Sequence, residues 1–398
     1  MSILKRRAGV AAVACAAALA LSAPNAFAAS PGDDSAVPIS VDGAVVVASQ
    51  DAPTAVRIAG KDRVATAIKA ACSRTFSKHA ILASSSNFAD ALASGPLADA
   101  WDAPIIVTPD GSSLDPQVLA YFALGCDGKA GTRDEITSVT ITSGTGVLTD
   151  GIVKQLKDAI TWDTKNTPVT TDDVLNGGAA VARVDRVAGA NRYQTSAAIA
   201  WALPTHWAST PEIFFADGNN FPDALAAGAA AANHRGVVLL TMEDDGLDSS
   251  TFKYATSKPW ANYAAVNHGQ LWAVGGNAAK AVKKGHLGEA VEIPASQVLV
   301  GEDRYETAAM LAKAIFVKPV DAVVASGESY ADAVFAGGYA ANLDAPLLLT
   351  NPSTLSSKTA DYLKAEAANK LARVIVMGGT GSVTPAVQGQ IVTAITAM

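Results

Sequence analysis

A phrase recurs three times along the 398-residue chain, and this repeat constrains the fold more than any other feature. The copies read GKDRVATAIKAA at 60–71, GANRYQTSAAIA at 189–200 and GEDRYETAAMLA at 301–312. A second phrase follows each copy, as SNFADALASG at 86–95, NNFPDALAAG at 219–228 and ESYADAVFAG at 328–337. A third phrase comes next, as APIIVT at 103–108, GVVLLT at 236–241 and APLLLT at 345–350. Such ordered recurrence predicts three tandem modules of about 100–110 residues, near the usual domain size.

The order of the elements within each repeat predicts an α/β fold. In the first repeat, short apolar runs at 55–59, 80–84, 104–108 and 138–142 alternate with helical stretches. Short, continuously apolar strands that alternate with helices are typical of a parallel sheet covered on both faces. We therefore expect three small parallel-sheet βα modules in a pseudo-threefold arrangement. The modules are expected at 54–165, 180–287 and 293–398, with the strand at 55–59 as the first of module one.

The N-terminal residues 1–28 have the pattern of a secretory signal peptide. Basic residues at 5–7 precede an apolar stretch, and Ala-Phe-Ala at 26–28 forms a small-x-small cleavage site. The apolar stretch is short for a membrane span, and the residues before Cys15 fit lipidation poorly. We expect export with cleavage near residue 28, no membrane association afterwards, and a short linker at 29–53.

The charge balance limits the partners of the chain. The formal net charge is −7, and removal of the signal segment lowers it to −10, because that segment carries three basic and no acidic residues. An acidic surface argues against nucleic acid as a partner. Any site for an anion must therefore be local.

Two cysteines remain after cleavage, Cys72 and Cys126, and both lie in the first repeat. In an exported protein such a pair is a possible disulfide, and two buried thiols are the alternative. The other two repeats manage without a cysteine pair, so a bridge would only reinforce the first.

Helix capping explains much of the repeated polarity. Asp62, Asn191 and Asp303 are suited to cap the helix of the first phrase, with Gln194 and Glu306 completing capping boxes. The second phrase suggests the same motif through the pairs Asn87 and Asp90, Asn220 and Asp223, and Ser329 and Asp332.

The repeated arginines Arg63, Arg192 and Arg304 are not explained by capping. They fall in the first turn of a helix, where the macrodipole disfavours a cation, so an acidic partner or an anionic ligand is expected. One hypothesis is an internal pair within each repeat. The other is a polymer groove beyond the carboxyl ends of the strands, and both can hold. The internal pairs would be Arg63 with Asp90, Arg192 with Asp223, and Arg304 with Asp332.

Tyr193 and Tyr305 follow their arginines and could stack on a sugar, whereas Val64 in the first repeat shows that the fold does not need a tyrosine. The glycine-rich turns at 143–146, 275–277 and 378–381 lack the ending of a P-loop. No G-x-S-x-G motif occurs, and the five histidines occupy no repeated position and show no metal-ligand spacing. We expect no catalytic residue, no metal site and no cofactor.

The three phrases together resemble the cell wall binding repeat 2 modules of Gram-positive surface proteins, over about 54–398. The resemblance implies a small α/β module, a trimer-like arrangement of three copies, and non-covalent attachment to the wall through anionic secondary polymers. This chain departs from the pattern at Val64 and Ala65, and at Val298, where the other repeats have Arg57 and Arg186. We therefore expect a secreted, wall-associated protein that binds an anionic polymer or peptidoglycan through Arg63, Arg192 and Arg304.

Three other functions remain open from the sequence. The chain could be a structural or protein-interaction scaffold of the envelope without affinity for glycans. It could be an accessory modifier of a wall hydrolase. A hydrolase with an unrecognised site is the third, and the missing nucleophile motif and repeated histidine argue against it.

Overall fold

The computed structural model describes residues 53–74, 77–87, 91–128, 136–160, 183–204, 212–243, 245–257, 271–284 and 293–397. The chain divides into two units, Met1–Pro38 and Ile39–Met398, and every described residue belongs to the second. The predicted signal peptide at 1–28 and nearly all of the predicted linker at 29–53 lie outside the described residues.

The strands of the described part form three sheets of four parallel strands each. Sheet one has the order β3 (Ile105–Thr108), β2 (His79–Ser84), β4 (Ser138–Ile141) and β5 (Arg183–Arg186). Sheet two has the order β7 (Val237–Thr241), β6 (Ile213–Asp217), β8 (Leu271–Val274) and β9 (Val298–Leu299). Sheet three has the order β11 (Leu347–Thr350), β10 (Asp321–Ser326), β12 (Arg373–Met377) and β1 (Thr54–Ile58). The expected α/β class with three parallel-sheet modules is confirmed.

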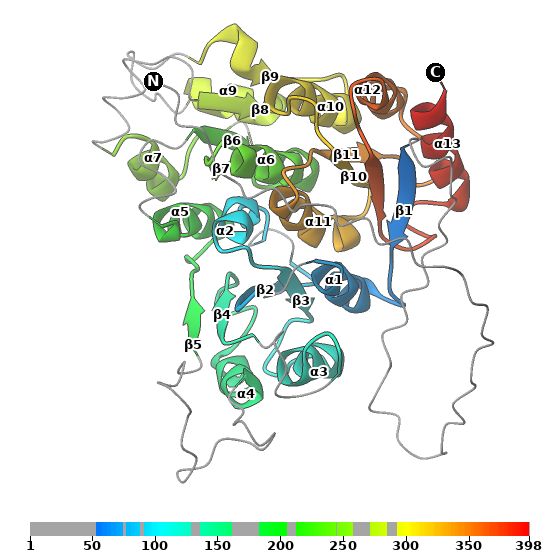
Figure 1. Ribbon diagram of the computed structural model, residues 1–398. Helices are drawn as coiled ribbons and strands as arrows, with labels where there is room; N and C mark the ends of the chain where they lie inside the picture. Colours follow the sequence, from blue (N-terminus) through cyan, green and yellow to red (C-terminus); the bar gives the residue numbers. More distant parts are fainter. Residues whose placement is uncertain are drawn as a thin grey trace, which may run out of the picture. The chain divides into compact units, whose positions relative to one another are not determined.

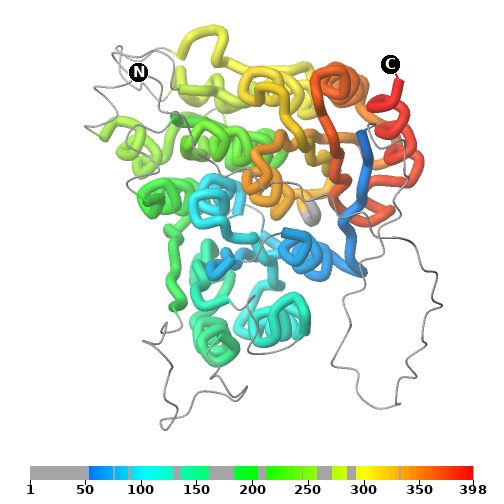
Figure 2. The backbone as a smooth tube through the Cα atoms, in the orientation of Figure 1, coloured from blue at the N-terminus to red at the C-terminus, as the bar shows by residue number. Residues whose placement is uncertain are grey.

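The first strand of each repeat belongs to the sheet of another repeat. β5 begins repeat two but pairs with β4, and β9 begins repeat three but pairs with β8. β1 begins repeat one and pairs with β12 near the other end of the chain, with Val56 opposite Ile375 (Figures 1 and 2). The expectation that 55–59 is a strand of module one's own sheet is therefore wrong. An apolar run identifies a buried strand, but it carries no information on which sheet the strand joins.

In each repeat, a helix follows each of the four strands. Those of the first phrase are α1 (Arg63–Cys72), α5 (Arg192–Ala202) and α10 (Arg304–Ile315). Those of the second phrase are α2 (Gly95–Ala100), α6 (Phe221–Asn233) and α11 (Tyr330–Asn342). Those after the third strand are α3 (Pro116–Leu124), α7 (Ser249–Ala255) and α12 (Ser357–Ala367). The last set is α4 (Asp150–Ile160), α9 (Gly276–Lys284) and α13 (Pro385–Thr396), and η2 (Ala295–Gln297) is a short 3-10 turn.

The helices of the second phrase meet one another. α2, α6 and α11 are in mutual contact, one from each repeat, which gives the arrangement its pseudo-threefold centre (Figure 1). The phrase ends in glycine in all three copies, and close packing at the centre explains two of them. A Cβ on Gly95 would lie 2.7 Å from the carbonyl carbon and oxygen of Gly228. A Cβ on Gly337 would lie 3.2 Å from the carbonyl oxygen of Leu225.

In repeats one and three, the two faces of the second strand, β2 or β10, contribute to different cores. In β2, Ile81 belongs to a large core that also contains Phe214 of repeat two and Val323 of repeat three, while its neighbour Leu82 belongs to a separate core of repeat one. Successive side chains of a strand point to opposite faces, so one sheet can face both cores. The three repeats therefore share one continuous core.

A disulfide supports the separate core of repeat one. It joins Cys72 at the end of α1 to Cys126 beyond α3, with the two Cα atoms 5.4 Å apart. The partly buried cysteines pack against that core. The bridge thus ties α1 to the chain that follows α3.

Candidate functional site

The first phrase begins its helix as the sequence predicts. Asp62 Oδ1 accepts a hydrogen bond from the Ala65 amide at 2.8 Å, and Asn191 Oδ1 accepts from the Gln194 amide at 2.9 Å. Asp303 Oδ1 accepts from the Glu306 amide at 2.8 Å. These bonds satisfy amide groups that the first turn of a helix leaves without an intrahelical partner.

A glycine and a threonine complete the first phrase, and sequence analysis missed their role. The hydroxyls of Thr66, Thr195 and Thr307 accept hydrogen bonds of 2.9, 3.0 and 3.1 Å from the amides of the glycines six residues earlier. The glycine must be small, since a Cβ on Gly189 would lie 2.3 Å from Gln194 Cβ. The constant spacing of Gly and Thr was the available signal. The hydrogen bond between the glycine and the threonine fixes the loop that positions each repeated arginine.

The capping box predicted for the second phrase is wrong for the described helices. Neither Asn220 nor Ser329 makes a side-chain cap bond at the start of its helix. In repeat one the described helix begins at Gly95, well after Asn87. The last residue of the second strand supports this turn instead. Ser326 Oγ accepts from the amides of Glu328 and Ser329, both at 3.2 Å.

Each repeated arginine braces the turn after the second strand of its own repeat. Arg63 Nη1 donates to the Ser85 carbonyl at 2.6 Å. Arg192 Nη1 donates to the Gly218 carbonyl at 2.7 Å, and Arg304 Nη1 donates to the Gly327 carbonyl at 2.5 Å. The cation that the helix dipole disfavours is thus held by a backbone oxygen.

The arginines also lie at joints between repeats. α10 packs on α6, and the charge of Arg304 acts on Asp223 in α6 of the preceding repeat. The pKa of Asp223 is raised to about 7, chiefly by burial and also by the charge of Asp217, while Arg304 opposes the shift. The Arg63 guanidinium lies 5.7 Å from the ring centre of Tyr330 in repeat three.

This arrangement corrects the predicted pair of Arg192 with Asp223. The arginine whose charge acts on Asp223 comes from the next repeat, because α10, which begins at Arg304, packs on α6 of repeat two. For the other two predicted pairs, Asp90 lies outside the described residues, and the side chain of Asp332 does too. Those pairings stay predictions.

The tyrosines that follow two of the arginines have a packing role. A Cβ on Gly218 would lie 2.6 Å from Tyr193 Cε1, and a Cβ on Gly327 would lie 2.6 Å from Tyr305 Cε1. Each ring therefore covers a glycine. Repeat one has Val64 at the tyrosine position and Ser85 at the glycine position, so the two positions change together. Burial raises the pKa of both tyrosines. Stacking of a sugar on them stays a prediction.

A second arginine lies on the first strand of two repeats. Arg57 Nη1 donates to the Gly378 carbonyl at 2.7 Å, and its Nε donates to Gln388 Oε1 at 3.0 Å. Arg186 Nη1 donates to the Ser143 carbonyl. Sheet two has Val298 at the equivalent position, opposite Ala273. These arginines hold the glycine-rich turn that follows the fourth strand.

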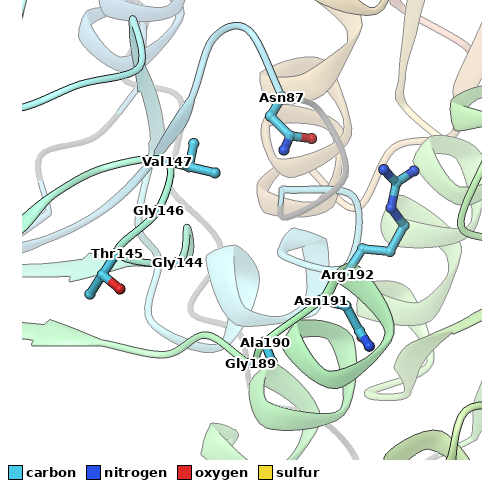
Figure 3. Close-up of a pocket in the computed structure, with 9 residues that line it drawn as sticks. All are labelled: Asn87, Gly144, Thr145, Gly146, Val147, Gly189, Ala190, Asn191 and Arg192. Atoms are coloured by element: carbon cyan, nitrogen blue, oxygen red, sulfur yellow. The ribbon is translucent and has the colours of Figure 1, made fainter.

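A cavity of about 350 Å³ lies at the carboxyl ends of the strands of sheet one. The cavity is lined by one residue after β2, by the turn after β4 and by the loop between β5 and α5 (Figure 3). β3 and β4 lie on opposite sides of β2, so the cavity is at the point where the strand order reverses. In open parallel sheets this crevice is the usual ligand position. The lining residues are Asn87, Gly144, Thr145, Gly146, Val147, Gly189, Ala190, Asn191 and Arg192.

The described lining of the cavity is polar and carries one cationic side chain. Its lining offers the side chains of asparagine, threonine and arginine together with glycine-rich backbone. Among the described residues that line it there is no histidine, cysteine or carboxylate. In the described stretches, no group of three His, Cys, Asp or Glu side chains is placed to hold a metal ion. Across the same stretches, no helix has the length and apolarity needed to cross a membrane.

Comparison with solved structures gives the fold. The chain is similar to Cwp6 from Clostridium difficile, with a TM-score of 0.65 and 21% identity, over 87% of this chain and 48% of that one. It is also similar to Cwp8 from Clostridium difficile, with a TM-score of 0.62 and 21% identity, over 86% of this chain and 52% of that one. At this identity the likeness concerns the fold alone.

Comparison of sequences gives the family. The chain is 30% identical over 208 residues to the N-acetylmuramoyl-L-alanine amidase LytC of Bacillus subtilis (strain 168). The match spans 52% of this chain but only 38% of the amidase. The model of the cell wall binding domain 2 (CWB2) family matches at 57–153, 186–282 and 299–388, which together make up well over half of the chain. The protein thus belongs to the cell wall binding domain 2 family, as three tandem copies of that domain.

Proposed function

We propose that this protein is a secreted, non-catalytic anchor that holds to the cell wall by binding an anionic secondary polymer. The family supports binding to the wall. The choice of an anionic polymer rests on one observation: Arg192 lines a cavity at the crevice of sheet one. The signal peptide predicted at 1–28 supports export.

The cavity offers the groups that an anion needs. Guanidinium is suited to bidentate contact with phosphate or carboxylate. Arg192 is also the first residue of α5, so the amides of the first turn add their positive dipole at the same place. The glycines of the lining leave backbone accessible to a ligand. A focused site of this kind is compatible with an acidic chain, because it does not need a broad basic surface.

Co-sedimentation of residues 29–398 with protein-stripped cell walls tests the proposal. Walls would be compared before and after acid extraction of their secondary polymers. We expect binding that disappears with extraction. Binding that survives extraction would identify peptidoglycan as the ligand and contradict the proposed polymer. Binding to neither wall would favour the scaffold with protein partners.

A variant in the cavity makes the test specific. Thr145 is exposed in the turn after β4 and lines the cavity, so Thr145→Glu adds a negative charge without removing a described hydrogen bond. We expect it to weaken binding to unextracted walls about tenfold, as loss of one charge-assisted contact would. The control is Ser112→Glu, at another exposed residue of repeat one outside the cavity lining, which makes the same change of charge. Equal loss in both variants would show that net charge, and not this cavity, controls binding.

A further inference from the structure

The three sheets have the same register, so the residues at their carboxyl ends can be compared position by position. The last paired residues of the second and third strands are Ser84 with Thr108, Asp217 with Thr241, and Ser326 with Thr350. Ser84, Asp217 and Ser326 therefore occupy one position. Sheet two has a carboxylate where the other two have a hydroxyl.

The serines and the aspartate make the same backbone contact. Ser84 Oγ accepts hydrogen bonds of 3.0 and 2.7 Å from the amides of Ser86 and Asn87. Asp217 Oδ1 accepts a hydrogen bond of 2.8 Å from the Asn219 amide. Its other oxygen, Oδ2, accepts from Asn277 Nδ2 at 2.7 Å. Because serine supports this turn in two repeats, the negative charge of Asp217 is not required for the turn.

At two further positions the carboxyl end of sheet two carries less positive charge than those of the other sheets. Sheet three has Arg57 on its first strand, and sheet one has Arg186, whereas sheet two has Val298. After the first strand, sheet three continues with Lys61 and sheet two with Glu302. Not every charge follows this trend, since Asp110 bonds to Ser84 in sheet one and Asp150 lies 3.4 Å from Arg186. The aspartate of the second phrase is common to all repeats and does not distinguish them.

The arginine of sheet two is opposed by nearby carboxylates. The charge of Arg304 lowers the pKa of the buried Asp223, and the charge of Asp217 raises it. Asp217 itself is 2% exposed. An anion approaching Arg304 would therefore come near Asp217, a carboxylate that the other two sheets lack at this position. Repulsion between like charges at short range in a partly buried site is strong enough to exclude a ligand.

We propose that the protein binds its anionic polymer at the carboxyl ends of sheets one and three. The carboxyl end of sheet two does not bind the polymer, because it has Asp217 and Val298 in place of a serine and an arginine. This inference rests on the proposed function and adds the number and identity of the subsites. Asp217 is the specificity-determining residue, because it places a negative charge at the end of the second strand, where the other two sheets have a neutral serine. Two subsites on one rigid chain bind a repeating polymer more tightly than one by raising its effective concentration.

A gain of binding tests the inference. The variant Asp217→Ser with Val298→Arg gives sheet two the residues that the other sheets have at both positions. We expect its affinity for unextracted walls to rise about tenfold, as a third subsite would provide. The addition of Arg304→Ala should abolish this gain. The control is Asp361→Ser with Val320→Arg, which makes the same charge change at two exposed residues of repeat three.

The loss variants identify the subsites in use. Thr380 is the residue of sheet three that corresponds to Thr145 of sheet one, and it is exposed. Thr380→Glu should weaken wall binding as Thr145→Glu does. Unfolding in urea would accompany each variant, so that a folding defect is recognised.

The outcomes separate this inference from the proposed function. If the unaltered chain binds no polymer, the proposed function is overturned and this inference with it. If the unaltered chain binds but the folded double variant shows no gain, this inference alone is overturned. A gain equal to that of the control would show a general effect of charge and would also overturn it.

Discussion

Arg57 donates a hydrogen bond of 2.7 Å to the carbonyl oxygen of Gly378, 321 positions further along the chain. The bond joins the first strand of the described chain to the turn after the fourth strand of repeat three. It belongs to a longer parallel pairing in which Thr54 lies opposite Arg373 and Ile58 opposite Met377. The first described strand therefore completes the sheet of repeat three, and the repeats form a closed set.

Loss of this closure should loosen sheet three. Arg57→Ala removes the bonds to Gly378 and Gln388, and we expect the free energy of unfolding to fall by about 2–3 kcal/mol. Hydrogen exchange at the amides of β12 should quicken, because β1 covers that strand. The exposed Lys364→Ala is the control and should leave both measurements unchanged. Exchange at β12 that is the same in Arg57→Ala and the unaltered chain would contradict the closure.

The glycines at the centre should respond unequally to the same substitution. Gly95→Ala would place a Cβ 2.7 Å from backbone atoms of Gly228, which cannot move without α6, so we expect a loss of about 1–3 kcal/mol. In Gly228→Ala the nearest atom would be the Leu92 carbonyl at 3.6 Å, an ordinary contact. Because Gly228 is inside a helix, alanine there should be neutral or stabilise by about 0.5–1 kcal/mol. Thermal unfolding of the two variants checks this order, and equal losses would contradict it.

Much of the fold could be predicted because it depends on local signals. The third phrase predicted a strand at 104–108, and the structure has β3 at Ile105–Thr108. The cap residue of the first phrase predicted the start of α1 after Asp62. Both signals, an apolar run and a polar cap, act between residues that are close in the chain. The ordered recurrence of the three phrases then predicted the number of modules.

The relationships between repeats could not be predicted from such signals. The pairing of Val56 with Ile375 depends on which sheet has an unpaired edge strand, and no local sequence pattern encodes that. Asp223 resembles a capping residue in sequence, but it is buried against the turn at Gly275 and feels Arg304 of the next repeat. The error about its partner follows from the same cause. A repeat in the sequence does not show whether equivalent groups meet within one copy or across two.

The covariation of tyrosine and glycine predicts a compensating pair. Gly218→Ser should clash with the Tyr193 ring, because its Cβ would lie 2.6 Å from Cε1. Repeat one carries Ser85 with Val64 at these positions, so Tyr193→Val should relieve the clash. We expect Gly218→Ser alone to cost about 1–3 kcal/mol and the double variant to cost less than the sum of its single variants. A double-mutant cycle from urea unfolding measures the coupling. Additive effects would show that the ring and the glycine position are independent.

The buried carboxyl of Asp223 should make stability depend on pH. Its pKa is raised to about 7 in the folded chain, chiefly by burial, whereas an unfolded aspartate has a pKa of about 4. Between these values the folded state binds more protons than the unfolded state, so the free energy of unfolding falls as pH rises from about 4 to about 7. At about 1.4 kcal/mol per pKa unit, the loss amounts to at most about 4 kcal/mol.

Asp223→Asn should remove this dependence, because an amide of nearly the same shape stays neutral throughout. Urea unfolding at pH 5 and pH 8 gives the comparison, and we expect the variant to gain stability over the unaltered chain at pH 8 more than at pH 5. The exposed Asp361→Asn is the matched control and should keep the slope of the unaltered chain. The same slope in Asp223→Asn would mean that Asp223 ionises in the folded chain as it does in the unfolded one. In that case Arg304 would offset the whole cost of burial, and the joint between repeats two and three would be a satisfied ion pair.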